Sequence, residues 1–272
     1  MLTACVAAAV VAATASASAA VATVRHVADL RRDTASSSNW ARYGLTPAVG
    51  GAVTSFTNVI GTWVQPPVAC TAGSPSYSAF WVGLGGMSPE STSLEQIGTE
   101  SNCASDGSAK YDAWYEILPA PPVPLKIAVA PGDKMSAAVT VTGRIVRMRL
   151  RNLTRRTVVN KKLTRAAPDL TSAEWVAEAP SSCSRDGRCS VLPLADFGSV
   201  DFLQAAATGS RHAGLIPDPA WTATAITLDG TRPTGFFGGG TGGASASAVP
   251  TEVSPEGSFS VVWQALAAAG AS

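Results

Sequence analysis

Residues 144–151 read Arg-Ile-Val-Arg-Met-Arg-Leu-Arg, and from Val146 to Arg151 apolar and charged side chains alternate one by one. In an extended strand, successive side chains point to opposite faces, so this pattern predicts a strand with one buried face and one solvated face. An amphipathic helix would instead repeat its apolar residues three and four positions apart. The stretch therefore indicates a half-buried β-strand.

Similar short runs occur on both sides of this stretch, separated by Gly, Pro, Ser and Asn, and no stretch has the helical period over a useful length. This organisation predicts an all-β sandwich or barrel. Residues 236–250 are rich in Gly, Ala and Ser, and we expect them to form a loop. Strands are expected at residues 56–64, 78–84, 94–100, 111–117, 125–130, 134–142, 144–151, 174–179, 199–206, 223–228 and 259–264.

The charge of the chain limits its possible partners. The net charge is +1 and only 14% of the 272 residues are charged, which argues against nucleic acid or an acidic membrane as the main partner. Nine of the 20 basic residues nevertheless lie between Arg144 and Arg165. This cluster indicates a solvated basic sheet face, with an anion-binding surface as the alternative.

The first residues resemble a secretory leader, which we place at residues 1–22, because they are nearly all small or apolar. No positive charge precedes this run, so the true start of the signal could lie further upstream. Cys5 lies in a lipobox-like string, and a lipid anchor there is the alternative. We expect residues 23–37 to be a short propeptide or linker, and residues 38–272 to form one domain of a secreted protein.

Four cysteines follow the leader, which suits disulfides in an oxidising compartment. Cys183 and Cys189 flank a turn sequence, so we expect them to pair with each other and Cys70 to pair with Cys103. Free thiols or a metal site are the alternatives, but the Cys-His spacing of zinc ligands is absent.

The histidine content excludes several reaction types. His212 is the only histidine beyond the N-terminal segment, and its context is loop-like, so a His-dependent triad is not expected. The sequence also lacks a zinc-binding HExxH string, a Gly-Lys-Ser/Thr phosphate loop and the paired Asp-Thr/Ser-Gly strings of aspartic proteases. The remaining possibility is a reaction in which a side-chain carboxylate acts as the acid or base.

Two polar residues lie in suitable strands for such chemistry. Strand alternation places Gln96 on one face with Leu94 and Glu100, and places Glu174 on one face with Val176 and Glu178. An ionised Glu can take a proton from water as a general base, and a Gln amide can donate a hydrogen bond to the oxyanion of a tetrahedral intermediate. Each residue taken alone is more often an ordinary surface side chain, and only their joint occurrence with the strings below favours catalysis.

Five strings, taken in order, resemble the glutamic peptidases (eqolisins), a family of acid-acting endopeptidases. The resemblance extends from about Asn39 to about Trp263. It implies a concanavalin-like jelly roll, a β-sandwich of two large antiparallel sheets, with the active site on the concave sheet. By motif position, the family's catalytic Gln and Glu fall on Gln96 and Glu174. The strings are Phe-Trp-Val-Gly-Leu-Gly-Gly (80–86), Leu-Glu-Gln-Ile-Gly-Thr-Glu (94–100), Tyr-Asp-Ala-Trp-Tyr-Glu (111–116), Ser-Ala-Glu-Trp-Val-Ala-Glu (172–178) and Leu-Ala-Asp-Phe-Gly (194–198).

The resemblance also implies substrate-binding residues. Trp81, Trp114 and Glu116 match positions that line the cleft, and Trp40 matches the start of the family's mature domain. Two positions differ from the fungal members, which carry Asp in place of Gly85 and Asp in place of Glu100. Glu100 is nonetheless expected to contact substrate, and these differences bear on subsite preference and pH optimum.

The sequence therefore predicts a secreted, monomeric endopeptidase of bacterial type that acts on polypeptides without a metal or cofactor and without stable membrane association. Two alternatives remain. A jelly-roll glycoside hydrolase would place Glu100 and Glu174 on either side of a sugar bond. A lectin-like carbohydrate-binding module would use the tryptophans to stack on sugar rings.

Overall fold

The computed structural model describes residues 23–25, 36–88, 91, 93–184, 188–231 and 245–266. The predicted leader, including Cys5, and most of the predicted linker lie outside these residues. Every element in the described part is a β-strand. The strands are β1 (Thr23–Arg25), β2 (Ser36–Ser37), β3 (Trp40–Pro47), β4 (Phe56–Val64), β5 (Ala79–Gly85), β6 (Leu94–Cys103), β7 (Ala109–Ile117), β8 (Val123–Pro124), β9 (Lys134–Thr142), β10 (Ile145–Asn152), β11 (Thr157–Thr164), β12 (Ala173–Glu178), β13 (Ser181–Cys183), β14 (Cys189–Val191), β15 (Ser199–Gly209), β16 (His212–Leu215), β17 (Trp221–Leu228), β18 (Ala246–Pro250) and β19 (Phe259–Ala265).

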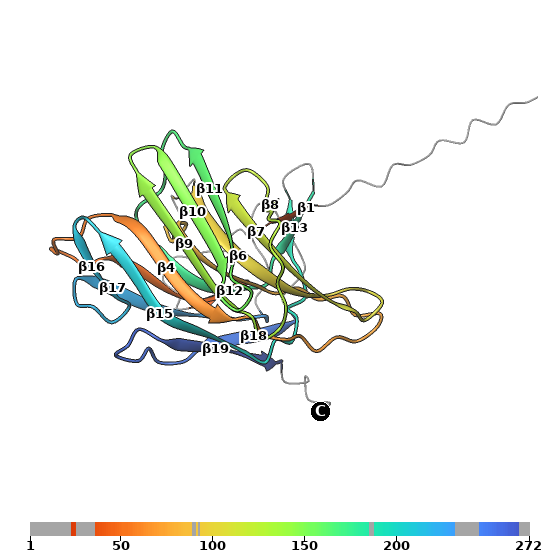
Figure 1. Ribbon diagram of the computed structural model, residues 1–272. Helices are drawn as coiled ribbons and strands as arrows, with labels where there is room; N and C mark the ends of the chain where they lie inside the picture. The colour runs from red at the N-terminus through yellow and green to blue at the C-terminus, as the bar shows by residue number, and fades with distance from the viewer. Residues whose placement is uncertain are drawn as a thin grey trace, which may run out of the picture.

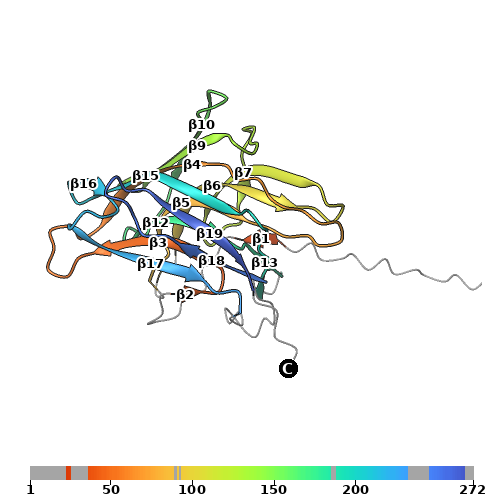
Figure 2. The same ribbon diagram turned by 90° about the horizontal axis from the view of Figure 1, so that it is seen from below.

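Two antiparallel layers form the sandwich that the sequence predicted (Figures 1 and 2). The first layer, called here the site sheet, has the order β8-β7-β6-β5-β12-β3-β17. The second layer, called here the back sheet, has the order β11-β10-β9-β4-β15-β19-β18. The two are joined where β17 meets β18, through the pair Leu228 and Ala248.

The main core lies between these layers. Trp175 of β12 donates from its indole nitrogen to the carbonyl of Ile60 on β4, over 2.9 Å. Trp63 of β4 likewise donates to Thr99 of β6, over 3.1 Å. These hydrogen bonds between the layers fix the layers relative to each other as well as satisfying the indole N–H groups.

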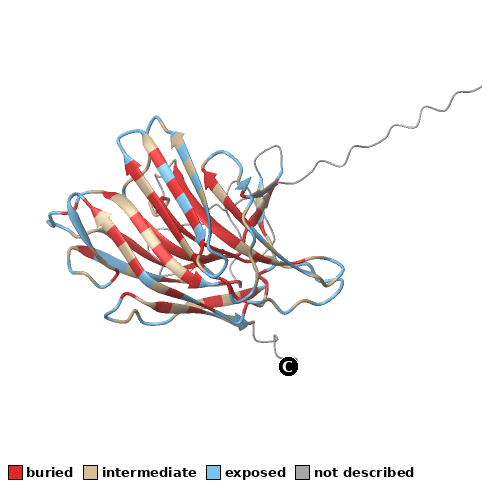
Figure 3. Ribbon diagram, in the orientation of Figure 1, coloured by how far each residue is buried: buried red, intermediate tan, exposed pale blue. Residues whose placement is uncertain are grey.

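Strand β10 has the predicted alternation. Val146, Met148 and Leu150 are buried in the core, and Arg147 and the other strand arginines are exposed (Figure 3). The basic face is therefore the outer face of the back sheet.

Most expected strands are present, with ends shifted by a few residues. The expected strand at 125–130 is wrong, because these residues pair with no neighbour as a strand. The expected loop at 236–250 is wrong at its end, where β18 forms, and residues 232–244 lie outside the described part. Among the longer strands, β3, β11 and β18 were not predicted, and neither were the short strands β1, β2, β8, β13, β14 and β16.

Both predicted disulfides are present. Cys183 and Cys189 join β13 to β14, with their sulfur atoms 2.05 Å apart. Cys70 and Cys103 join a loop to the end of β6, with their sulfur atoms 1.97 Å apart. In the described residues, no helix is long and apolar enough to cross a membrane.

Candidate active site

The two faces of β12 differ: one packs into the main core and the other carries the candidate catalytic residue. Ala173, Trp175 and Ala177 point into the main core between the layers. Val176 belongs instead to a second apolar cluster, on the outer face of the site sheet. Glu174, which alternates with Trp175, shares this outer face with Val176, as the sequence predicted.

One row of residues crosses the site sheet on this face. Glu174 of β12 lies opposite Gly83 of β5, Gly83 lies opposite Gln96 of β6, and Gln96 lies opposite Glu116 of β7. Neighbouring strands are about 4.8 Å apart, so the Cα atoms of Glu174 and Gln96 are separated by roughly 10 Å, with Gly83 between them. The side chains of residues paired in this way point to the same face.

Gly83 lets the side chains around the row pack closely over the strand. A Cβ atom at this position would lie 3.0 Å from Leu94 Cδ1, 3.0 Å from Trp81 Cζ3 and 3.3 Å from Gln96 Cβ. Such contacts are tighter than ordinary van der Waals packing, so any larger residue would push on the side chains around the row.

Glu174 is completely buried and has two hydrogen-bond donors. Arg42 of β3, also completely buried, donates from Nη1 to Oε2. Ser172 donates from Oγ to Oε1 over 3.1 Å. Burial raises the pKa of Glu174, and the charge of Arg42 only partly offsets that rise, so the pKa stays above its ordinary value.

Gln96 is held by its neighbour in the same row. Its Nε2 donates to Oε2 of Glu116 over 2.8 Å, and both side chains are completely buried. The amide nitrogen carries two N–H groups, and Glu116 accepts from one of them. Glu116 therefore fixes the orientation of the amide.

Aromatic side chains occupy the adjacent rows. Trp81, Trp40 and Trp114 belong to the apolar cluster on the outer face. The rings of Trp40 and Trp81 meet edge to face, with centroids 4.9 Å apart. Trp81 donates from Nε1 to Glu178 over 2.7 Å, which fixes the indole beside Gly83.

Glu100 lies on the same face but outside the row. It is four residues from Gln96 on β6, or roughly 13 Å along the strand. Its carboxylate accepts a hydrogen bond from Asn102. The two carboxylates of a glycosidase lie about 5–10 Å apart. Glu100 lies roughly 13 Å along the strand direction from the row that contains Glu174, which argues against the two acting together as a glycosidase pair.

The structure also explains Gly85, where the resemblance leads one to expect Asp. Its φ is +83°, in the left-handed region, and a Cβ there would lie 2.5 Å from the Cβ of Asp169. Asp169 accepts hydrogen bonds from Ser91 and from the backbone N–H of Gly86. A carboxylate from a different segment thus occupies the space beside Gly85.

Sequence reasoning missed Arg42, Ser172 and Asp169 as parts of this site. Arg42 gave the clearest available signal, because it is the one charged residue in the otherwise apolar and small-residue strand β3. Ser172 and Asp169 gave none, since both lie in a loop before β12. His212 lies on β16, paired to the back sheet, and binds Asp218 at 2.9 Å.

The arrangement combines a buried carboxylate, a fixed amide and a buried aromatic cluster. Within the described residues, no group of three or more His, Cys, Asp or Glu side chains is placed to hold a metal ion. A carboxylate of raised pKa can accept a proton from water, and an amide N–H can stabilise an oxyanion.

The chain is similar in sequence to known peptidases. Residues 38–234 match the Peptidase A4 family. Aspergillopepsin-2 of Aspergillus niger is 31% identical over 195 residues, which is 63% of this chain. The chain spans 64% of the length of that relative.

Solved structures have the same fold. Scytalido-glutamic peptidase, solved with a transition-state analog inhibitor, aligns with a TM-score of 0.62 and 24% identity, over 83% of this chain and 98% of that one. Aspergilloglutamic peptidase from Aspergillus niger aligns with a TM-score of 0.53 and 27% identity, over 69% of this chain and 99% of that one.

Proposed function

Because this chain belongs to the Peptidase A4 family, we propose that it is a secreted endopeptidase that hydrolyses peptide bonds in acid with Glu174 and Gln96. The observation that carries the proposal is the row in which Gly83 separates these two residues on one face of the site sheet. Polypeptides are its substrates, and it acts as a monomer.

The reaction begins when ionised Glu174 takes a proton from a water molecule, whose oxygen attacks the carbonyl carbon of the scissile bond. The carbonyl oxygen becomes an oxyanion and accepts a hydrogen bond from an N–H group of Gln96. Protonated Glu174 then gives its proton to the leaving nitrogen, and the C–N bond breaks. The products are a carboxylic acid and an amine.

The other side chains of the site either orient these two residues or contact the substrate. Arg42 and Ser172 orient the carboxylate of Glu174, and Glu116 orients the amide of Gln96. Trp81, Trp40 and Trp114 form a buried apolar cluster next to these two residues, and we expect substrate side chains to pack against it. Glu100 lies at the far end of the same face and contacts residues of the substrate distant from the cleaved bond.

An assay of the purified protein on an acid-denatured protein substrate tests the class. We expect cleavage in mildly acid solution and little cleavage at about pH 2, because the base is a carboxylate whose pKa lies above its ordinary value. Cleavage should persist with pepstatin, which inhibits aspartic peptidases, and with a metal chelator. Release of sugars from a polysaccharide, without cleavage of protein, would contradict the proposal.

A further inference from the structure

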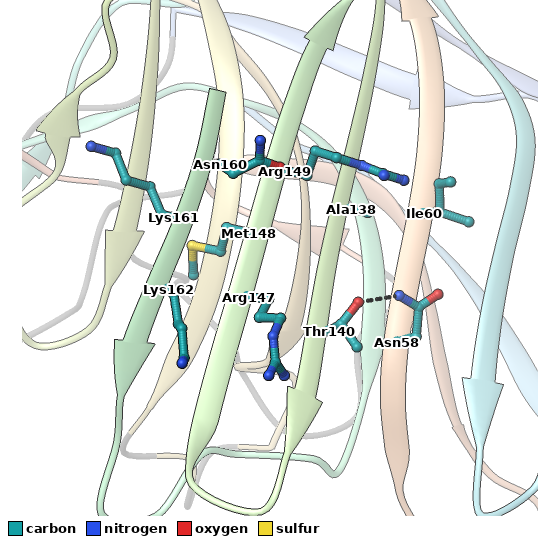
Figure 4. A pocket seen from close by; sticks show the side chains of 10 residues that line it. All are labelled: Asn58, Ile60, Ala138, Thr140, Arg147, Met148, Arg149, Asn160, Lys161 and Lys162. Atoms are coloured by element: carbon teal, nitrogen blue, oxygen red, sulfur yellow. Dashed lines mark hydrogen bonds between the residues drawn. The ribbon is translucent and has the colours of Figure 1, made fainter. Parts of the chain in front are cut away.

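The outer face of the back sheet carries a groove of about 470 Å³, formed by β4, β9, β10 and β11 (Figure 4). Polar and charged side chains from all four strands line it. Those that carry the argument are Asn58, Thr140, Arg147, Arg149, Asn160 and Lys162.

The groove is strongly positive. The four strands together contain six Lys or Arg residues and no Asp or Glu. Arg147, Arg149 and Lys162 are exposed, and within the described part of the chain none of them forms an ion pair. Uncompensated cations on one face attract anions.

The cations are regularly placed. Arg147 and Arg149 are two residues apart on β10, or roughly 7 Å. Lys162 of β11 lies directly opposite Arg147. A ligand that contacts all three needs several anionic groups repeated along its length.

Neutral hydrogen-bonding groups lie between these cations. Asn58 donates from Nδ2 to Oγ1 of Thr140 over 2.7 Å and to the carbonyl of Val139 over 3.2 Å, so its amide is held in place (Figure 4). Asn160 lies opposite Arg149. Amides and hydroxyls suit a ligand that carries hydroxyl groups as well as carboxylates.

We propose that this groove binds an extended acidic polysaccharide, with carboxylates on the arginines and Lys162 and hydroxyls on Asn58, Thr140 and Asn160. Single-stranded nucleic acid fits less well, because the groove lining includes no aromatic side chain on which bases could stack. A flat anionic membrane would not reach into a concave surface.

The groove lies on the opposite side of the sandwich from Glu174 and Gln96. Val146, Met148 and Leu150 of β10 point into the core that separates the two outer faces. A bound polysaccharide would therefore lie away from the candidate active site and would hold the protein on an acidic matrix. This inference does not depend on the peptidase activity.

The test is binding to polygalacturonate at low salt, followed by titration with salt. The variant Arg147→Ser/Arg149→Ser is compared with Lys110→Ser/Lys126→Ser, which removes the same charge from exposed sites outside the groove. We expect the first variant to bind about tenfold or more weakly and to lower the slope of log affinity against log salt by about 2, since each cation that contacts a polyanion contributes about one unit.

Equal loss of binding in the two variants, or no binding of polygalacturonate by the unmodified protein, would overturn the proposal. Tighter binding of a single-stranded oligonucleotide or of phosphatidylserine vesicles than of polygalacturonate would also overturn it. The far-UV circular dichroism and the urea unfolding midpoint of Arg147→Ser/Arg149→Ser should be unchanged, which shows that the variant is folded.

Discussion

Arg42 donates a hydrogen bond from Nη1 to Oε2 of Glu174, and neither side chain reaches solvent. A buried carboxylate without a partner would remain protonated over a wide pH range, and a protonated Glu cannot act as a base. The guanidinium stays charged at any working pH, so it favours the ionised form of Glu174 in spite of burial. The contact between Arg42 and Glu174 therefore helps to set the lower end of the pH range in which Glu174 can act as a base.

Replacing Arg42 with Met should move the acid limb of kcat/KM to higher pH by about 1–3 units, because an adjacent opposite charge lowers a carboxyl pKa by that much. Arg42→Lys, which keeps the charge, should shift the limb much less. The measurement is the pH profile of each variant. Its midpoint does not depend on how much of the protein is folded, and equal midpoints for the two variants would rule out this role.

Asp169 should act in the opposite direction. Its negative charge raises the pKa of Glu174, so Asp169→Asn should move the acid limb to lower pH, by less than about 1 unit. Asp229→Asn is the matched control, because Asp229 accepts from Thr231 as Asp169 accepts from Thr171. A shift in the control of the same size would show that the effect is not local.

Any side chain at position 83 should lower the activity. In Gly83→Ala the new methyl group would press on Trp81, Leu94 and Gln96. Overpacking of this kind costs about 1–3 kcal/mol of stability, and a misplacement of about 1 Å at a reacting centre can cost about 10²-fold in rate. Urea unfolding and kcat/KM measure the two effects, and a stable variant with unchanged kcat/KM would contradict the assigned geometry.

Glu95 should make the protein less stable as the pH rises. Burial, only partly offset by a hydrogen bond from Ser93 and by the charge of Arg165, raises the pKa of Glu95 from 4.5 to about 7. The folded state therefore keeps a proton that the unfolded state has lost, and stability falls from about pH 4.5 to pH 7 by up to about 3 kcal/mol from this group.

In Glu95→Gln this contribution should disappear. Urea unfolding at both pH values should show a smaller loss of stability in the variant than in the unmodified protein. An identical loss in both proteins would assign the pH dependence to other groups.

Strand alternation predicted much of the fold and the faces of the site, because Val146, Met148 and Leu150 alternate with solvated arginines. The pattern fails where both faces are covered. Strand β3 buries Ala41 and Tyr43 in the main core and Trp40 on the site face, so it shows no polar alternation. Strand β18 is short and made mostly of small residues, which resemble a loop in composition.

The prediction of a strand at residues 125–130 failed for the opposite reason. Leu125, Ile127 and Val129 do pack against the core, so their alternation is real, but apart from the Leu125 N–H, which donates to Ala113 of β7, the backbone forms no ladder with a neighbouring strand. Pro124 and Pro131, at either end, lack the N–H groups that a ladder needs. Periodicity reports which side chains are buried and does not report hydrogen bonding.

The candidate site could be predicted only in part. Motif order indicated Gln96 and Glu174, and strand alternation indicated their faces. Arg42 reaches the site from a distant strand through the register of β3 with β12, and Asp169 reaches it through the conformation of the loop before β12. No local pattern in the sequence records such contacts.

The most direct measurement is peptide hydrolysis at the optimum pH by Glu174→Gln, Gln96→Ala and His212→Ala. We expect Glu174→Gln to abolish turnover, since no group remains to take the proton from water, and Gln96→Ala to lower kcat by about 10²–10³-fold, the usual effect of losing one oxyanion donor. His212→Ala should retain activity, because His212 pairs with Asp218 on the back sheet. A folded Glu174→Gln protein that cleaves at the unmodified rate would contradict the account.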